Sequence, residues 1–203
     1  MTYDYHLLDR PWIVCVQSDG ASKSLGLRDI FAQAHMLREI SGDTPLETAA
    51  LHRLLLALLH CIFGPQDDRA WEALWAAGRF DTAQLDRYWA DYGACFDLFD
   101  TQAPFYQAPD DRVKPKPPNS LVLDLAFGNK ATLFDHHTDD EALTLSPAKA
   151  ARALVTLQAF GLAGLSGIRG DTFTDGPWTR GVVFLVQGET LFETLLLNAL
   201  VYP

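Results

Sequence analysis

Cysteine is scarce in this 203-residue chain, which has three, Cys15, Cys61 and Cys95, at wide spacing. An odd number of distant cysteines forms neither a disulfide framework nor a zinc site of the CxxC type. We therefore expect buried, inert thiols in a reducing compartment, and no bound metal or cofactor.

Long apolar runs are also missing. None reaches the roughly 18 residues that a membrane-spanning helix needs. The N-terminus, MTYDYHLLDRPW, lacks the basic start and apolar core of a signal peptide. These absences predict a cytoplasmic protein that does not associate with a membrane.

Positive charge is in deficit, with 16 Lys and Arg against 26 Asp and Glu and a net charge of −10. This balance excludes a protein that coats nucleic acid with its whole surface. Several basic residues nevertheless fall in segments rich in proline or glycine: Lys114, Lys116, Lys130, Arg169 and Arg180. Basic loops on an acidic body indicate a component of an assembly that contacts nucleic acid at few points.

The hydrophobic pattern of the first half predicts one hairpin and several helices. A strand at 12–17 leads into an Asp19-Gly20 turn and a return strand. Apolar residues from Leu27 to Leu37 repeat at helical spacing. The segment 44–64 is the clearest helix, capped by Thr44 with Glu47 three residues on, and is expected at the centre of the core with His52 and His60 packed or partly exposed. Further helices are expected at 69–77 and 82–92, with a core cluster formed by Trp71, Trp75, Tyr88, Trp89 and Tyr92.

The second half begins after a proline-rich linker at 108–120. We expect a strand at 121–127, a helix from Ser146 to Phe160, a buried strand at 181–188 and a last apolar helix at 190–201. Helices and short strands are mixed without βαβ regularity, which predicts an α+β fold. Residues 1–107 form its mostly helical part and 121–203 its α+β part, both within one large domain.

A glycine run follows the predicted 146–160 helix, with Gly161, Gly164, Gly167 and Gly170 before Gly176. It lacks the Gly-Lys-Ser/Thr ending of a Walker A motif, and it follows a helix where a dinucleotide fingerprint follows a strand. A flexible loop with tight turns is the simplest interpretation. Arg169 inside the run favours contact with a phosphate or a groove.

The tripeptide Asp135-His136-His137 is shared with the DHH phosphoesterases. Those enzymes need further carboxylates from an earlier strand to hold two metal ions, and Asp19 alone occupies the comparable place here. Gly164-Leu165-Ser166-Gly167 has the wrong spacing for a nucleophile elbow. No complete catalytic set is present, so we do not expect an enzyme.

Six segments, in order along nearly the whole chain, resemble the CasA family, the large subunit of the type I-E CRISPR Cascade complex. They are LLDRPWIVCV, GDTPLETAALHRLLLALLH, FDLFDTQAPFYQ, GNKATLFDHH, LSPAKAARALVTLQAFGLAGLSG and TRGVVFLVQGETLFETLLLN. The resemblance implies the family's large N-terminal domain, without the C-terminal four-helix bundle that ends longer members. The chain would then be a fragment or a natural short form.

Two loops carry function under this resemblance. The 128–137 loop, with Lys130, Thr132 and Phe134, is similar to the family loop that contacts the 5′ handle of the guide RNA and a neighbouring subunit. The glycine run, with Gly161, Gly164, Gly167, Arg169 and Gly170, is similar to the loop that enters the minor groove of the protospacer-adjacent motif (PAM).

The resemblance therefore implies a non-catalytic Cascade subunit for antiviral defence. It would recognise the PAM in double-stranded DNA, bind target DNA, and dock guide RNA and the other Cascade subunits. The full-length family subunit also recruits a helicase-nuclease. Two alternatives stay open: a metal-dependent phosphoesterase built on Asp135, His136 and His137, and an acidic scaffold that does not contact nucleic acid.

Overall fold

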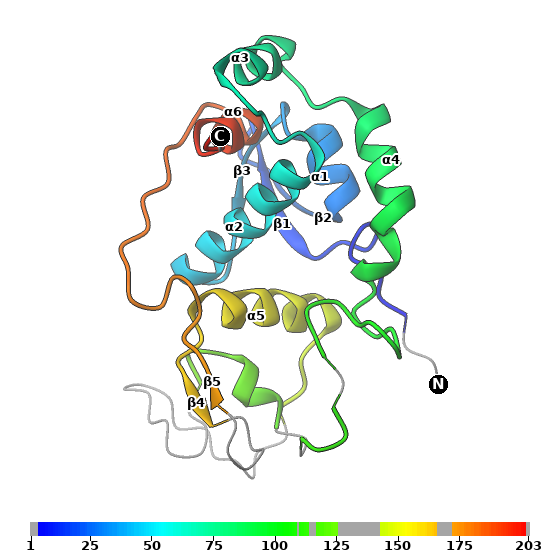
Figure 1. The fold of residues 1–203 in the computed structure, drawn as a ribbon, viewed down its shortest axis with the longest axis vertical. Helices are drawn as coiled ribbons and strands as arrows, with labels where there is room; N and C mark the ends of the chain where they lie inside the picture. The colour runs from blue at the N-terminus through cyan, green and yellow to red at the C-terminus, as the bar shows by residue number, and fades with distance from the viewer. Residues whose placement is uncertain (1–3, 109, 114–116, 126–142, 166–171, 202–203) are drawn as a thin grey trace.

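The computed structural model describes residues 4–108, 110–113, 117–125, 143–165 and 172–201 (Figure 1). Helices surround one small sheet, and a short hairpin lies apart from it, so the predicted α+β class is confirmed. The elements are β1 (Ile13–Gln17), β2 (Ser22–Leu25), α1 (Leu27–Gln33), β3 (Leu37–Ser41), α2 (Pro45–Ile62), α3 (Asp68–Ala77), α4 (Thr82–Tyr92), η1 (Gly93–Phe96), η2 (Pro118–Leu121), α5 (Pro147–Phe160), β4 (Gly164–Leu165), β5 (Thr172–Phe173) and α6 (Leu191–Leu197).

The larger sheet is antiparallel, with strand order β2-β1-β3. Strands β1 and β2 form the predicted hairpin, in which Ile13 lies opposite Leu25. At its turn, Asp19 Oδ1 accepts the N–H of Ala21 at 2.9 Å, and Gly20 has a φ of 84°. Glycine suits this left-handed position because it has no Cβ.

Strand β3 replaces the last turn of the helix predicted up to Leu37. Helix α1 ends at Gln33, and Leu37 opens the strand with its side chain buried. Ile40 is buried as well, while Arg38 is exposed. Pairing with β1 therefore decided the conformation of a segment whose apolar spacing also fits a helix.

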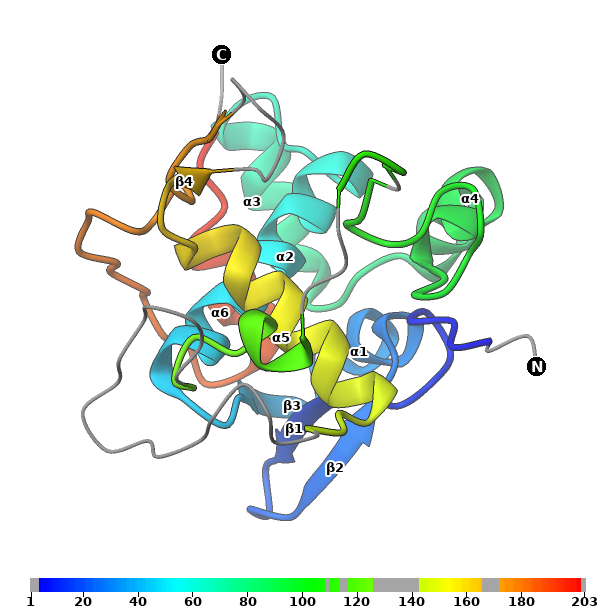
Figure 2. The same cartoon turned by 90° about the horizontal axis from the view of Figure 1, so that it is seen from below.

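Helix α2 runs between the sheet and α5, as predicted for a core helix (Figures 1 and 2). Thr44 Oγ1 accepts the N–H of Glu47 at 3.1 Å. The Glu47 carboxylate accepts the N–H of Asp43, also at 3.1 Å, one residue before the partner of a standard capping box. The buried apolar side chains of α2 are Ala50, Leu51, Leu54, Leu55, Leu58, Leu59 and Ile62.

Helix α2 is also long and apolar enough to cross a membrane by composition alone, with a mean hydropathy of 1.2 over 18 residues. Half of that window is buried inside the fold. The buried face packs on α5 and on the core, and a core helix of a globular domain has these same properties.

The predicted aromatic cluster divides between two helices. On α3, Trp71 stacks on Trp75 with ring centroids 5.2 Å apart, and on α4, Tyr88 packs edge to face with Trp89 at 5.3 Å. Trp89 is buried, as expected of a core residue. The prediction is wrong for Trp75 and Tyr92, which are 37% and 55% exposed, because they lie on the outer faces of short peripheral helices.

The cysteine prediction is confirmed at one position and wrong at two. Cys15 lies in the core on β1, and burial raises the pKa of its thiol to about 12. Cys61 and Cys95 are exposed. They lie at the surface near the end of α2 and in η1.

The second half contains two wrong strand predictions and two confirmed helices. Residues 121–125 continue the 3₁₀ turn η2 as a turn, because Pro117 and Pro118 favour a tight bend over a strand. The 181–188 stretch is neither a strand nor buried. Helices α5 and α6 begin after the caps Ser146 and Thr190. One apolar core includes residues from both sides of 108–120, and the predicted division of the chain stays a prediction.

Candidate functional site

The predicted contact residues lie mostly outside the described residues. Lys130, Thr132, Phe134, Gly167, Arg169 and Gly170 belong to this group, as do Asp135, His136 and His137 of the alternative metal site. Gly161 and Gly164 are described: Gly161 caps the C-terminal end of α5, and Gly164 begins β4. The other contact residues stay predictions, and the described segments 117–125, 143–165 and 172–201 flank them in sequence.

The described part of the glycine run forms the stem of a hairpin below one end of α5 (Figure 1). Strands β4 and β5 pair antiparallel, with Gly164 opposite Phe173 and Leu165 opposite Thr172. The run thus enters a short strand where the sequence predicted only a loop. Two residue pairs make a ladder too short to be stable alone, so the stem depends on its attachment to the body.

The attachment is a set of hydrogen bonds at the C-terminal end of α5. The carbonyl of Gly161 accepts the N–H of Gly176 at 2.7 Å and the hydroxyl of Thr179 at 3.0 Å. The N–H of Trp178 is donated to the carbonyl of Ala159 at 3.0 Å. The segment that follows β5 is therefore fastened to the last turn of the helix that precedes β4.

Both glycines of this attachment are required by packing. A Cβ on Gly161 would lie 2.6 Å from the carbonyl oxygen of Leu157, and a Cβ on Gly176 would lie 2.6 Å from that of Ala159. Both distances are shorter than Cβ atoms tolerate. Gly161, predicted as a nucleic-acid contact, thus has a structural reason to be glycine.

Asp175 fixes the other side of the stem. Its carboxylate accepts the N–H of Ala163 at 2.6 Å and also pairs with Arg180. The hydrogen bond from Ala163, together with Arg180, holds the pKa of the Asp175 carboxyl below its usual value. Arg180, one of the basic residues predicted in loops, is therefore paired with a carboxylate.

A second cation, Arg53 of α2, lies next to the same stem. Its guanidinium lies over the ring of Trp178, 5.8 Å from the centroid. Within the described ranges Arg53 makes no ion pair with a carboxylate. Sequence analysis missed this residue because one arginine inside a helical pattern carries no local signal.

An ion-pair network fastens the N-terminal half of α5 to the body. Arg152 Nε lies 2.6 Å from Glu47 Oε1, and Arg152 also donates to the carbonyl of Trp12 at 2.9 Å and to Asp43 at 3.2 Å. Sequence reasoning assigned Glu47 to helix capping alone. Nothing in the local sequence indicates a partner 105 residues away.

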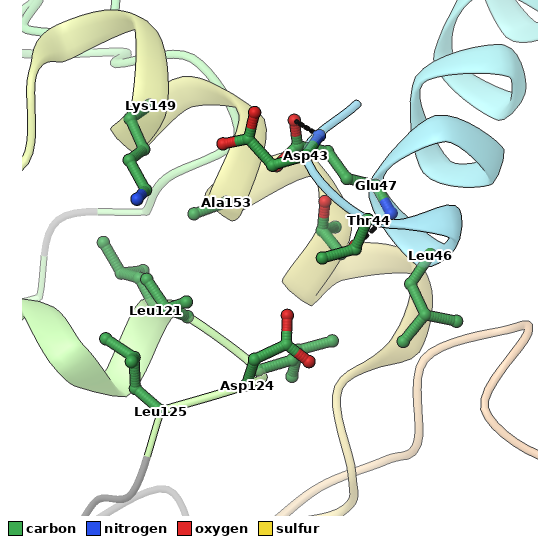
Figure 3. A pocket seen from close by; sticks show the side chains of 12 residues that line it. Asp43, Thr44, Leu46, Glu47, Leu121, Asp124, Leu125, Lys149 and Ala153 are labelled. Atoms are coloured by element: carbon green, nitrogen blue, oxygen red, sulfur yellow. Dashed lines mark hydrogen bonds between the residues drawn. The ribbon is translucent and has the colours of Figure 1, made fainter. Parts of the chain in front are cut away.

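Next to this network is a pocket of about 250 Å³ between the start of α2, α5 and residues 121–125 (Figure 3). Its lining includes four leucines, Leu46, Leu121, Leu123 and Leu125, and the charged residues Asp43, Glu47, Asp124 and Lys149. The segment 121–125 leads in sequence toward the predicted 128–137 loop.

The described residues contain no metal-binding cluster. No three His, Cys, Asp or Glu side chains among them lie close enough together to hold a metal ion. His52 is buried, its Nδ1 lies 2.8 Å from the carbonyl oxygen of Thr48, and burial lowers its pKa.

Comparisons with known proteins agree over nearly the whole chain. A family model described as CRISPR-associated protein Cse1 matches residues 6–203. The CRISPR-associated protein CasA/Cse1 of Thermus thermophilus is 38% identical over 204 residues, which cover 98% of this chain and 40% of that protein. The chain therefore spans about 40% of the length of this relative.

Solved structures of Cse1 proteins match this chain as well. Cse1 from Acidimicrobium ferrooxidans matches with a TM-score of 0.79 at 36% identity, over 98% of this chain and 38% of that one. Thermobifida fusca Cse1 matches with a TM-score of 0.83 at 32% identity, over 98% and 39%. A chain of a CRISPR RNA-guided surveillance complex matches with a TM-score of 0.81 at 29% identity, over 96% and 43%.

Proposed function

The chain belongs to the family of CRISPR-associated protein Cse1, and on this basis we propose that it is a non-catalytic subunit of a type I-E Cascade complex. In this role it contributes to PAM recognition and target DNA binding. It also docks guide RNA and partner subunits, in the cytoplasm, as part of antiviral defence.

The observation that carries the proposal is the match to chains of solved RNA-guided surveillance complexes. One such chain matches with a TM-score of 0.85 over 98% of this protein at 29% identity. A fold shared over this length places corresponding segments of the two chains at the same positions in space. Other Cascade subunits are therefore the proposed partners.

The β4–β5 hairpin is the proposed DNA-contacting element. Glycine backbone without side chains suits a minor groove about 6 Å wide. The segments on either side of the strands are held together near the end of α5, since Gly161 accepts the N–H of Gly176 and Asp175 accepts the N–H of Ala163. This arrangement supports entry of Gly164, Gly167 and Gly170 into the groove, with Arg169 at a phosphate.

Arg53 adds a proposed phosphate contact at the base of the same hairpin. Its guanidinium lies over the ring of Trp178, 5.8 Å from the centroid, and has no carboxylate partner in the described part of the chain. Arginine on an aromatic face keeps its donors free for a bidentate phosphate contact. One such contact fits a protein whose net charge of −10 limits it to few phosphates.

The 128–137 loop is proposed to contact the 5′ handle of the guide RNA through Lys130, Thr132 and Phe134. Stacking of an aromatic side chain on a base contributes roughly 1–3 kcal/mol without reading sequence. Recruitment of a helicase-nuclease belongs to the full-length family subunit. For this chain we propose a part in helicase-nuclease recruitment only within an assembled complex.

The test is reconstitution of the chain with the other Cascade subunits and guide RNA, followed by binding to DNA with and without a PAM. Replacement of Gly164 and Gly167 by valine should leave assembly intact and weaken PAM-dependent binding. Gly181→Val is the matched control, because a Cβ at Gly181 meets no atom within 4 Å. Equal DNA binding by all variants would refute the role of the hairpin.

Two further measurements separate the proposal from its alternatives. Arg53→Ala and Arg169→Ala should each lower the salt dependence of DNA binding by about one counterion. Manganese-dependent hydrolysis of a short oligonucleotide that His136→Ala abolishes would establish the phosphoesterase instead. Indifference of the chain to guide RNA and Cascade subunits would favour the scaffold.

A further inference from the structure

The 175–180 segment, which follows β5, holds an exposed arginine beside the β4–β5 hairpin. Arg180 donates from Nε to the carboxylate of Asp175, and among the described residues this is the contact that its guanidinium makes. The side chain of Arg180 is 80% exposed. A guanidinium carries five N–H donors, so the contact through Nε leaves the four donors of the two Nη groups unused.

Other arginines in exposed ion pairs use more of their donors inside the fold. Arg28 donates from Nε to Asp9 and from Nη1 to Asp86. Arg112 donates from both Nε and Nη2 to Asp110. The pair at Arg180 differs because the carboxylate orients the guanidinium through Nε and leaves the Nη edge, through which arginine donates two hydrogen bonds to a phosphate.

Asp175 is well suited to orient Arg180, because it is itself held in place. Its side chain is only 21% exposed, and its carboxylate accepts the N–H of Ala163 at 2.6 Å. This hydrogen bond lowers the pKa of the Asp175 carboxyl, so the group is charged near neutral pH. Ala163 directly precedes β4, and the orientation of Arg180 is therefore tied to the base of the hairpin.

A second arginine lies at the same segment. The guanidinium of Arg53 is 5.8 Å from the ring centroid of Trp178, two residues before Arg180. The N–H of Trp178 and the hydroxyl of Thr179 both bond to carbonyls at the end of α5. On a chain with a net charge of −10, two arginines at one fixed segment are a local concentration of positive charge.

We propose that Arg180 contacts a backbone phosphate of the duplex DNA at the β4–β5 hairpin, and that Asp175 is the positioning residue that holds its guanidinium for this contact. The inference rests on the proposed role of the hairpin in DNA binding. Duplex DNA is favoured over guide RNA because Asp175 joins Arg180 to the hairpin through Ala163. A phosphate contact orients the duplex and reads no base.

The test measures DNA binding by the Cascade complex reconstituted with guide RNA. Arg180→Ala should weaken binding about tenfold, as expected for a hydrogen bond between charged groups. It should also lower the slope of log affinity against log salt concentration by about 0.9. Arg180→Lys should keep the slope and lose part of the affinity, because lysine has no planar fork to hold both partners. Arg28→Ala is the control, since it removes the same charge on α1, away from the hairpin (Figures 1 and 2).

Asp175→Asn tests the positioning role through the sign of its effect. Removal of a negative charge beside DNA should by electrostatics alone tighten binding. Loss of the group that orients Arg180 should weaken it, and we expect this result, with a smaller loss than for Arg180→Ala. In the Arg180→Ala background, Asp175→Asn should have no further effect on DNA affinity, because the two residues act as one unit.

Four outcomes would overturn the inference. Unchanged affinity and salt slope for Arg180→Ala, in a complex that binds DNA, would refute the phosphate contact and leave the proposed function intact. Tighter binding by Asp175→Asn, or an equal loss with and without Arg180, would refute the positioning role. Loss of guide RNA in place of DNA would make Arg180 an RNA contact. Failure of the assembled wild-type complex to bind DNA would refute the proposed function, and this inference with it.

Discussion

Arg152 and Glu47 form an ion pair with 2.6 Å between Nε and Oε1, and their side chains are only 12% and 10% exposed. Arg152 comes from α5 and Glu47 from the first turn of α2. The pair therefore fixes the helix that supports the hairpin against the helix at the centre of the core.

Arg152→Ala should lower the free energy of unfolding by about 3–5 kcal/mol, because it leaves the Glu47 carboxylate nearly buried without its cation. Urea unfolding measures the loss. Arg28→Ala, which removes an exposed pair with Asp9 and Asp86, should cost no more than about 1 kcal/mol. Similar losses for the two variants would show that burial does not strengthen the Arg152 pair.

Gly161→Ala and Gly176→Ala should each destabilise the domain by about 1–3 kcal/mol, because each new methyl group would overlap a helix carbonyl oxygen. Thermal unfolding measures the effect. Gly181→Ala, in open space, should leave the melting temperature unchanged or raise it slightly. If Gly161→Ala behaves like Gly181→Ala, the attachment of the hairpin to α5 is looser than its hydrogen bonds indicate.

The native chain should show two fast-reacting thiols and one slow one toward a thiol reagent such as DTNB. Cys61 and Cys95 are exposed, while Cys15 is buried with a pKa of about 12 and supplies almost no thiolate. After denaturation all three should react at similar rates. Fast modification of Cys15 in the native chain would contradict its place in the core.

The stability of the chain should fall as pH decreases from about 7 to 5. Burial lowers the pKa of His52 in the folded state below the 6.5 of an unperturbed histidine. Below that value the unfolded state binds a proton that the folded state does not, so acid favours unfolding. His52→Gln should make this decline shallower, and NMR titration should find the pKa of His52 below 6.5. A titration of His52 at or above 6.5 would exclude it as the source of the decline.

Phe134→Ala should weaken incorporation of the chain into a reconstituted Cascade complex and barely change its melting temperature. The expectation rests on the proposed contact between the 128–137 loop and guide RNA or a neighbouring subunit. Pull-down with tagged partner subunits measures incorporation. A large fall in melting temperature with normal incorporation would place Phe134 in the core and remove its proposed role.

The elements that the sequence predicted correctly are those with local chemical signals at their ends. Thr44 and Pro45 begin α2, Ser146 begins α5, and Asp19-Gly20 closes the first hairpin. In each case the side chain that sets the boundary bonds to backbone within three residues. Such signals can be read without knowledge of the rest of the fold.

The elements that sequence analysis missed depend on partners far away along the chain. Leu37 joins a strand because β1 is beside it, and Val182–Val186 stays exposed because no described strand is beside it. The same principle applies to the site. Glycine spacing indicated the hairpin region, whereas Arg53 and Arg152 depend on residues more than 100 positions away.

Helix α6 closes the core with contacts to residues near the start of the chain. Phe192 donates its N–H to the carbonyl of Ala34 at 3.1 Å, and the indole of Trp71 donates to the carbonyl of Leu196 at 2.9 Å. On a ribosome, these partners emerge long before residue 192 is synthesised. Until α6 is synthesised, the apolar surface that it covers has no partner, and exposed apolar surface of this kind makes a folding intermediate prone to aggregation.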